Sequence, residues 1–352
     1  MEVAFKDILY IYEEQISKNV KNKKKLLNFE RNKFQNLINI YYDLKNNNYS
    51  INHYNIFLIK EPKKRIVMSL SIRDKIINHY VTEFILKPKL EKYLDIRNIA
   101  TRKGMGSDYG IRLVKKYLEK LKKYDQVYAL KLDISKYFYS IDHRVLKNMI
   151  KKDLNLDEYK IVSSIIDSTN ASYVNKIIAK YQKQDANLPN YQYQKGLPIG
   201  NLTSQFLSVF YLNEIDHYII HNLHLKYYVR YMDDFLIFHH NKKYLEIVLK
   251  IIREKLNNIY HLKLNNNKTK IVNVKGGFTF LSYYFKLKNK KTVMKLRGET
   301  LVKVKKNIRK VNILYNNHKI AFPKYFSFLN NYAYSFKYNN NYKITKHIER
   351  TF

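Results

Sequence analysis

The sequence of 352 residues predicts an α+β fold. Segments with helical and strand-like patterns come in mixed order, adjacent apolar runs suggest antiparallel hairpins, and no internal repeat is visible, which together favour α+β over a doubly wound sheet. The length allows a large core in two or three lobes. The apolar fraction of 45% is typical of a globular chain.

The first elements follow from periodicity and turn residues. Residues 1–50 alternate apolar and basic positions at helical spacing and break at NNNYS. NIFLIKEPKKRIVMSL predicts two strands around a Pro-Lys turn, followed by a helix from about Ile72. A glycine-bearing loop, TRKGMGSDYG, precedes the basic helix IRLVKKYLEKLKKY. The run QVYALKLDISKYF alternates with period two and predicts a strand that ends near Asp133.

The second half continues the mixed order. Residues 143–180 are expected to be helical, and GLPIGNLTSQFLSVFYLNEIDHYIIHNL predicts a Pro–Gly start followed by one long helix. LKYYVRYMDDFLIFHH predicts two strands joined at the acids, followed by a helix over about 242–258. KTKIVNV and GFTFLSYYFKL predict short strands, and the last sixty or so residues are basic and expected to be mostly helical.

Composition points to a polyanionic partner. The formal net charge is +37, and such a field favours nucleic acid because neutralised phosphates release counterions. The 34 Tyr and 18 Phe offer faces for base stacking, although an A+T-rich coding sequence would also enrich Lys and Tyr. The absence of cysteine excludes disulfides, cysteine zinc sites and thiol nucleophiles. No apolar run reaches the roughly 18 residues of a membrane span, and the N-terminus does not resemble a secretion signal, so no membrane partner and a cytoplasmic location are expected.

One pair of acids stands out. YVRYMDDFLIF places Asp233 and Asp234 side by side among apolar residues, although burying an unpaired carboxylate is costly. A tight turn between two strands would let both acids protrude into a cleft. Asp133, at the end of the alternating run LKLD, is the best third carboxylate. Three converging carboxylates suit two hard divalent cations, with Mg²⁺ usual for phosphate chemistry. The alternative is a solvated turn.

The sequence around these acids resembles the reverse transcriptases. YMDD between hydrophobic strands resembles their catalytic turn. Over about residues 55–290 the other blocks follow in order: KKRIVMSLSIRDKIINHYV and RKGMGSDYGI resemble the fingers motifs, LDISKYFYSIDH the palm block, GLPIGNLTSQ the loop before the long palm helix, LKLNNNKTKI the lysine-bearing block and FTFLSYYF the primer grip. The ending of GNLTSQ, and the closing FSFLNNYAYSFKYNNNY, resemble the enzymes of diversity-generating retroelements and bacterial defence-associated reverse transcriptases.

The resemblance implies a right-hand polymerase fold with fingers, a palm whose antiparallel sheet carries the catalytic acids, and a short helical thumb. In chain order it implies an N-terminal helical extension (1–50), the fingers (51–125) and the first part of the palm (126–145). A fingers/palm helical insertion (146–195), the rest of the palm (196–290) and the thumb (291–352) follow.

The resemblance also implies the catalytic groups. Asp133 and Asp233 would bridge two Mg²⁺ ions, for which Mn²⁺ is a possible substitute, with Asp234 as the third carboxylate and the carbonyl of Ile134 as a further metal ligand. Asp142 is expected to cap the helix that begins near residue 143 rather than to take part in chemistry.

Several nucleotide contacts are implied as well. Arg65 would reach the triphosphate, with Arg73 as a second candidate, although a solvated basic turn is the alternative for Arg65. A ring at Phe138 would exclude a 2′-hydroxyl, unless it is a core aromatic. Gly200 would let the backbone approach the nascent base pair. Ile199 stands where many of these enzymes carry Gln, which points to relaxed fidelity.

The remaining implied contacts involve the turn, a lysine and the primer. Tyr231 and Met232 complete the catalytic turn. Lys268 or Lys270 would stabilise charge near the triphosphate or protonate pyrophosphate, and a solvated lysine face is the alternative. The primer grip would comprise Leu281, Ser282 and Tyr283, where Ser282 replaces the usual glycine.

The activity implied by the resemblance is RNA-directed DNA synthesis. The chain would extend a primer 3′-hydroxyl with dNTPs by two-metal phosphoryl transfer, in a bacterial retroelement, and no RNase H block is expected. Two alternatives stay open: an antiviral defence reverse transcriptase with limited or no RNA templating, and a catalytically inactive nucleic-acid-binding scaffold. Expected partners are an RNA template and a DNA or RNA primer, with a structured non-coding RNA and a small accessory protein as further candidates. The sequence leaves the oligomeric state, the copied RNA and the priming mechanism undetermined.

Overall fold

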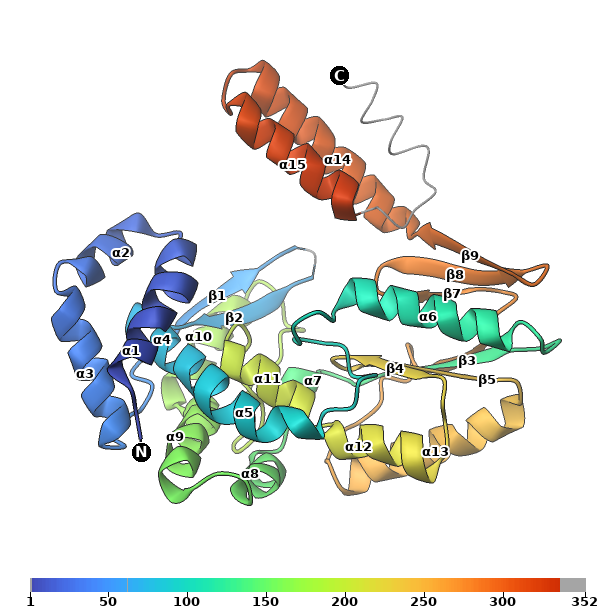
Figure 1. Cartoon of the computed structure of the whole chain (residues 1–352), viewed down its shortest axis with the longest axis horizontal. Helices are drawn as coiled ribbons and strands as arrows, with labels where there is room; N and C mark the ends of the chain where they lie inside the picture. Colours follow the sequence, from blue (N-terminus) through green and yellow to red (C-terminus); the bar gives the residue numbers. More distant parts are fainter. Residues whose placement is uncertain (1, 62, 336–352) are drawn as a thin grey trace.

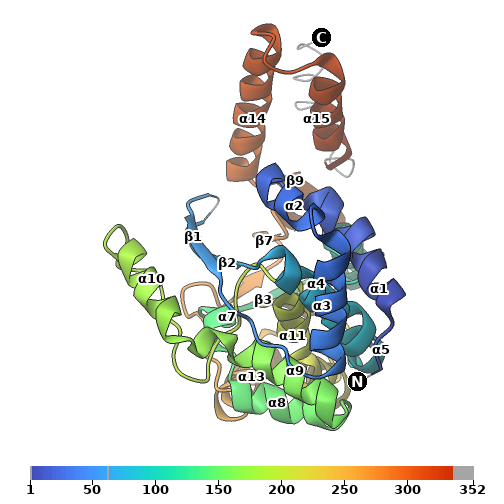
Figure 2. The ribbon, with the colours of Figure 1, turned by 90° about the vertical axis from the view of Figure 1, so that its left-hand side faces the viewer.

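The computed structural model describes residues 2–61 and 63–335 and confirms the α+β class. Antiparallel sheets of two, four and three strands are surrounded by helices, and a pair of helices extends away from the rest at the C-terminal end (Figures 1 and 2). Within the described residues no helix combines the length and the apolar character that crossing a membrane requires.

The four-stranded sheet forms the centre of the molecule. Its strand order is β4-β5-β3-β6, and every neighbouring pair is antiparallel. The strands are β3 (Tyr128–Asp133), β4 (Tyr228–Tyr231), β5 (Asp234–His239) and β6 (Lys270–Asn273). The predicted strand end at Asp133 is confirmed, and so are the two strands joined at the acids.

Both faces of this sheet are buried, which explains why its strands have nearly continuous apolar runs. Helix α13 (Lys242–Asn258) packs against β3, β5 and β6, and helix α6 (Ser107–Leu121) packs against β4 (Figure 1). Because side chains alternate along a strand, Phe235 and Ile237 enter one core while Leu236 and Phe238 enter the other. The sheet is therefore held rigidly from both sides.

The two-stranded sheet is the predicted hairpin. Strands β1 (Asn55–Ile59) and β2 (Arg65–Ser69) pair antiparallel and share a small core with α10 (Ser172–Gln182). Helix α4 (Ile72–Tyr80) then begins where predicted, because the Ser71 hydroxyl accepts a hydrogen bond from the Asp74 N–H.

Helices on both sides of the hairpin complete the main core. They are α1 (Phe5–Tyr10), α2 (Lys23–Glu30), α3 (Lys33–Lys45), α5 (Lys87–Leu90), α7 (Tyr137–Ser140), α8 (His143–Lys151), α9 (Leu156–Asp167), α11 (Leu202–Phe210) and α12 (Asn213–His217). The long helix predicted after the Pro–Gly loop is broken: α11 ends at Phe210 and α12 starts at Asn213. The Asn213 side chain donates a hydrogen bond to the Phe210 carbonyl, which takes this acceptor from the backbone of a continuing helix.

The C-terminal part contains a second correction. GFTFLSYYFKL forms a hairpin instead of one strand, and residues 291–296, expected to open a helical segment, add a third strand. The strands are β7 (Phe278–Phe280), β8 (Tyr283–Lys288) and β9 (Lys291–Leu296). Helices α14 (Gly298–Asn316) and α15 (Phe322–Ser335) follow and pack on each other through a core of their own (Figure 2). The end of the predicted thumb and of its closing motif, residues 336–352, lies outside the described residues.

Candidate active site

The turn between β4 and β5 carries the adjacent acids. Tyr231 pairs with Asp234, so Met232 and Asp233 are the only residues at the tip of this hairpin. Met232 has a φ of 55°. A positive φ at the first turn residue alone is the pattern of a type II′ turn, which usually has glycine there. The turn therefore holds a bulky residue in a strained conformation, a feature that tends to occur at functional sites.

The three predicted acids lie together. Asp133, the last residue of β3, is directly opposite Asp234, the first residue of β5. The adjacent acid Asp233 follows Asp133 by 100 positions in the sequence. Burial raises the pKa of Asp234 to about 6; Lys131 opposes the rise, and repulsion from Asp233 and Asp133 adds to it. Burial, together with repulsion from Asp133, also raises the pKa of Asp233. Two strand ends thus create one site with excess negative charge.

Lysines partly compensate this charge. The Lys268 ammonium lies 2.9 Å from both carboxylate oxygens of Asp133. Lys131, on β3, faces Asp234 closely enough to oppose the rise of its pKa, and it also donates a hydrogen bond to the Thr279 carbonyl. Lys270 lies on β6 opposite Lys131. Of the two lysines that the sequence left open, Lys268 is thus the one in contact with an acid.

The donor set fits hard divalent cations. Three carboxylates supply only oxygen ligands, and their mutual repulsion would be relieved by a bound cation. Among residues 2–61 and 63–335, however, no three His, Asp or Glu side chains are already arranged around a common metal position. The Lys268 ammonium occupies both oxygens of Asp133 instead. Ile134 is 2% exposed, so its side chain belongs to the core and only its backbone could reach a metal.

The hairpin β1–β2 brings a guanidinium toward the acids. Arg65 is exposed at the start of β2, and its charge lowers the pKa of Asp233, although burial of Asp233 has the larger, opposite effect. Arg73, the second candidate, is paired with acids elsewhere. Its guanidinium is bound to Asp43, at 2.8 Å, and to Asp74, at 2.9 Å. These two ion pairs already occupy the Arg73 guanidinium, so its predicted nucleotide contact is not supported.

The loop before α11 is attached to the same hairpin. The Met68 N–H on β2 donates a 2.9 Å hydrogen bond to the carbonyl of Ile199, whose side chain is half-buried. Gly200 has a φ of 113°, and a Cβ atom there would lie 2.9 Å from Cγ1 of Val67. Both the backbone conformation and the close approach therefore require glycine at this position.

Helix α7 places an aromatic ring five residues after Asp133. Phe138 is half-buried, and its ring meets that of Tyr137 edge to face at 6.0 Å. Tyr137 is 3% exposed and belongs to the core, so Phe138 is the more accessible ring. The Phe138 carbonyl accepts a 2.7 Å hydrogen bond from the Leu197 N–H, which fixes α7 to the loop. Asp142 caps α8 as predicted, because its carboxylate accepts hydrogen bonds from the backbone at 144 and 145.

The predicted primer grip is a tight turn. Leu281 and Ser282, with φ of 47° and 69°, connect β7 to β8, and positive φ at both positions is the pattern of a type I′ turn. Serine thus occupies a left-handed position that glycine would hold without strain. Leu281 lies against Gly110 of α6, and Tyr283 is buried.

A buried ion pair, which the sequence analysis did not predict, lies behind the turn of Met232 and Asp233. Arg230 and Asp216 are both 0% exposed, and Arg230 Nε lies 2.7 Å from an Asp216 oxygen. The same guanidinium donates to the carbonyls of Met232, at 2.8 Å, and Val209, at 3.0 Å, and the Tyr228 hydroxyl donates to Asp216. Burial would lower the pKa of Arg230, but the charge of Asp216 and the hydrogen bonds to it raise that pKa above its usual value. An arginine inside the apolar run YVRYM was the available signal.

The amino-acid sequence is similar to those of known proteins over part of its length. Residues 58–285 match the family described as reverse transcriptase (RNA-dependent DNA polymerase). The chain is similar to Protein YkfC of Escherichia coli strain K12, with 23% identity over 249 residues that cover 60% of this chain and 61% of that protein.

Two solved structures are also similar. One is a telomerase from Candida albicans in complex with the TWJ fragment of telomeric RNA, with a TM-score of 0.49 and 16% identity, covering 72% of this chain and 46% of the other. The second is an apo telomerase from Candida tropicalis truncated from its C-terminal domain, with a TM-score of 0.46 and 14% identity, covering 75% and 60%. The chain thus spans less than two thirds of each of these relatives.

Proposed function

The chain belongs to the reverse transcriptase (RNA-dependent DNA polymerase) family, and we propose that it extends the 3′-hydroxyl of a primer with dNTPs along an RNA template. The observation that carries this proposal is the pairing of Asp133 with Asp234 beside the tip residue Asp233. Asp133 and Asp234 lie at the ends of two neighbouring strands that cores on both faces of the sheet hold rigid, and Asp233 lies in the adjoining turn. All three carboxylates are present, which argues against an inactive scaffold.

Reverse transcriptases generally use divalent metal ions. In this chain Asp133, Asp233 and Asp234 would hold these ions, with the backbone carbonyl of Ile134 as a further donor. Mg²⁺ is the preferred ion because it binds carboxylate and phosphate oxygens together, and Mn²⁺ is a substitute. Such ions, when bound, lower the barrier by stabilising charge on the attacking and leaving oxygens. Lys268 would leave Asp133 and move its proton or charge toward the departing pyrophosphate.

The nucleotide would lie between the hairpin β1–β2 and the central sheet. Arg65 approaches the acids from that hairpin and would bind the triphosphate. Phe138 would exclude a 2′-hydroxyl, and Gly200 would allow the backbone at Ile199 to approach the nascent pair. Hydrophobic Ile199 offers no side-chain hydrogen bond there, which fits relaxed fidelity.

The template and primer would cross the central sheet. We assign fingers to residues 51–125, palm to 126–145 and 196–290 with the helical insertion between them, and thumb from 291 onward, after an N-terminal extension. The turn Leu281–Ser282, followed by Tyr283, would contact the primer. The net charge of +37 supports binding to the duplex backbone. A bacterial retroelement in the cytoplasm, with a structured RNA and a small accessory protein, is the biological setting that we propose.

Sequencing the product tests this function. Purified chain is incubated with a defined RNA template, an annealed DNA primer, Mg²⁺ and dNTPs, and the extended strands are sequenced. We expect DNA complementary to the template up to its 5′ end. Repetitive or random DNA would instead identify a defence enzyme that works without templating. Absence of extension, with RNA still bound, would identify a scaffold.

A further inference from the structure

The side chain of His143 is enclosed by the protein and takes no part in the chemistry proposed above. It is the first residue of α8 and is 1% exposed. Its Nε2 lies 2.7 Å from the carbonyl oxygen of Gly196, and its Nδ1 lies 3.2 Å from a carboxylate oxygen of Asp167. Because a carbonyl oxygen only accepts, Nε2 carries the proton in that contact. Asp167, the last residue of α9, fixes the orientation of the ring.

A second buried group donates to the same carbonyl. Thr169 is 2% exposed, and its hydroxyl donates a 3.0 Å hydrogen bond to the Gly196 oxygen. Gly196 itself has a φ of 87°, and a Cβ atom there would lie 2.6 Å from the ring of Tyr191. Both observations require glycine at this position. The loop that leads to Ile199 and Gly200 therefore starts from a fixed point.

One peptide group connects this point to α7. The carbonyl of Gly196 and the N–H of Leu197 belong to the same planar unit and point in opposite directions. The N–H end donates a 2.7 Å hydrogen bond to the carbonyl of Phe138 on α7. His143 and Thr169 thus hold one end of this peptide group, and Phe138 is attached to its other end. A rotation of the group would break the bond to Phe138.

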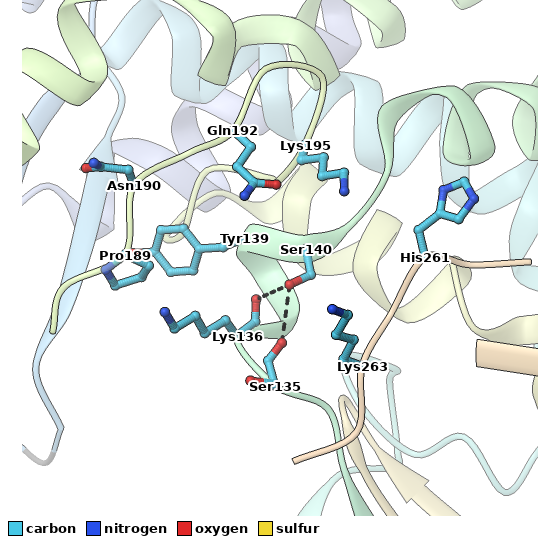
Figure 3. Close-up of a pocket in the computed structure, with 10 residues that line it drawn as sticks. All are labelled: Ser135, Lys136, Tyr139, Ser140, Pro189, Asn190, Gln192, Lys195, His261 and Lys263. Carbon is cyan, nitrogen blue, oxygen red and sulfur yellow. Dashed lines mark hydrogen bonds between the residues drawn. The ribbon is translucent and has the colours of Figure 1, made fainter. Parts of the chain in front are cut away.

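The helix α7 is short, with four residues, and main-chain hydrogen bonds attach it to the loop. Within its own segment, the Ser140 hydroxyl donates 3.2 Å hydrogen bonds to the carbonyls of Ser135 and Lys136, as Figure 3 shows. These bonds close the helix on itself. Attachment to the loop comes from the peptide group described above and from the Gly196 N–H, which donates a 2.8 Å hydrogen bond to the Ile141 carbonyl.

We propose that His143 is a positioning residue for sugar discrimination, which holds the peptide group of Gly196 and Leu197 so that the Phe138 ring stays where it meets a 2′-hydroxyl. The inference rests on the function proposed for Phe138, but the clamp itself does not require catalysis. Histidine suits this task because its rigid ring can bind an acid on α9 and a carbonyl in the loop at the same time. Small shifts of α7 matter, since a misplacement of about 1 Å can change a rate by roughly a hundredfold.

Two amide variants of His143 test the clamp. The Gln amide nitrogen reaches about the position of Nε2 and keeps a donor for Gly196, whereas the Asn amide nitrogen reaches only about that of Nδ1. The readout is the ratio of ribonucleotide to dNTP incorporation in single-nucleotide extension by the full chain. We expect His143→Asn to raise this ratio roughly threefold to tenfold, and His143→Gln to change it by less than about twofold.

A double-mutant cycle separates positioning from a loss of stability. Because His143 acts through Phe138, His143→Asn should not raise the ratio further when Phe138→Ala is already present. The control is Lys147→Met. Lys147 contacts the other carboxylate oxygen of Asp167 but not the loop, so its loss should change the ratio by less than about twofold. Thr169→Val removes the second donor at nearly the same volume and should raise the ratio, which keeps the test open if His143→Asn does not fold.

Hydrogen–deuterium exchange tests the clamp without activity. Mass spectrometry of a peptide that covers residues 194–199 should show faster exchange of the Leu197 amide in His143→Asn than in the wild type and in His143→Gln. Unchanged exchange, an unchanged incorporation ratio in both His143→Asn and Thr169→Val, or additive effects in the cycle would overturn the proposal. Failure of the wild-type chain to extend a primer would refute the proposed function, and the exchange result would then decide the clamp.

Discussion

Replacing Arg230 tests whether the buried ion pair holds the turn of Met232 and Asp233 in place. Arg230→Met removes the guanidinium that contacts Asp216, Met232 and Val209, and it leaves the Asp216 carboxylate buried without a cation. Both side chains are 0% exposed, so water cannot replace the lost partner without opening the core.

The expected loss of stability is large. Breaking a buried pair by removing one partner typically costs about 3–5 kcal/mol, because an uncompensated charge remains. For a chain of 352 residues that corresponds to a fall in unfolding temperature of roughly 4–7 °C. Thermal and denaturant unfolding monitored by circular dichroism measure it. The control is Arg144→Met, an exposed position on α8, which should change the free energy of unfolding by less than about 0.5 kcal/mol.

A combined variant separates stability from positioning. Arg230→Met with Asp216→Leu and Tyr228→Phe replaces the whole polar network by apolar groups, and such replacements are often neutral in stability. We expect stability close to that of the wild type but weaker primer extension, because the Met232 carbonyl has lost its donor. An Arg230→Met variant within about 1 kcal/mol of the wild type would refute the stability argument. Full extension by the combined variant would refute the positioning role.

Further predictions concern the strained turns, the ring and the metal. Ser282→Gly relieves a left-handed serine and should raise the free energy of unfolding by about 1 kcal/mol in urea titration; a destabilised variant would contradict the turn geometry. Gly200→Ala places a Cβ against Val67, and extension should fall roughly tenfold to a hundredfold with unchanged RNA affinity. Phe138→Ala should raise ribonucleotide incorporation relative to dNTP incorporation by about tenfold or more in single-nucleotide assays. An unchanged ratio of the two incorporation rates would indicate that Phe138 is a core aromatic. EDTA should abolish extension reversibly, with recovery on adding Mg²⁺.

The parts of the fold that local pattern determines were predictable from sequence. Period-two alternation marked β3 and its end at Asp133, and the apolar runs on both sides of the two acids marked a hairpin, although its turn consists of Met232 and Asp233 and Asp234 already belongs to β5. The block resemblance then connected acids 100 positions apart, which no local pattern could do, and the strand register of Asp133 with Asp234 agrees with that connection.

Tertiary partners explain what the sequence did not reveal. Arg73 belongs to a motif-like segment, but its role is decided by Asp43 and Asp74 in the folded helical layer. The same holds for Arg230. An arginine in an apolar strand indicates burial, but only the fold shows that Asp216 is its partner. The strand β9 was missed because its basic composition resembles that of the helix that follows, and pairing with β8 overrides this composition.

The measurement that tests the central claim most directly is primer extension by Asp233→Ala on an RNA template, beside the affinity for the same RNA by fluorescence anisotropy. Asp233 lies at the tip of a two-residue turn, where loss of the carboxylate removes a proposed metal donor and leaves the paired residues of the two strands in place. We predict that extension falls below detection while RNA affinity changes by less than about threefold, because binding rests on the distributed charge of the chain. Extension at a rate near that of the wild type would contradict the assignment of the acids as the catalytic centre.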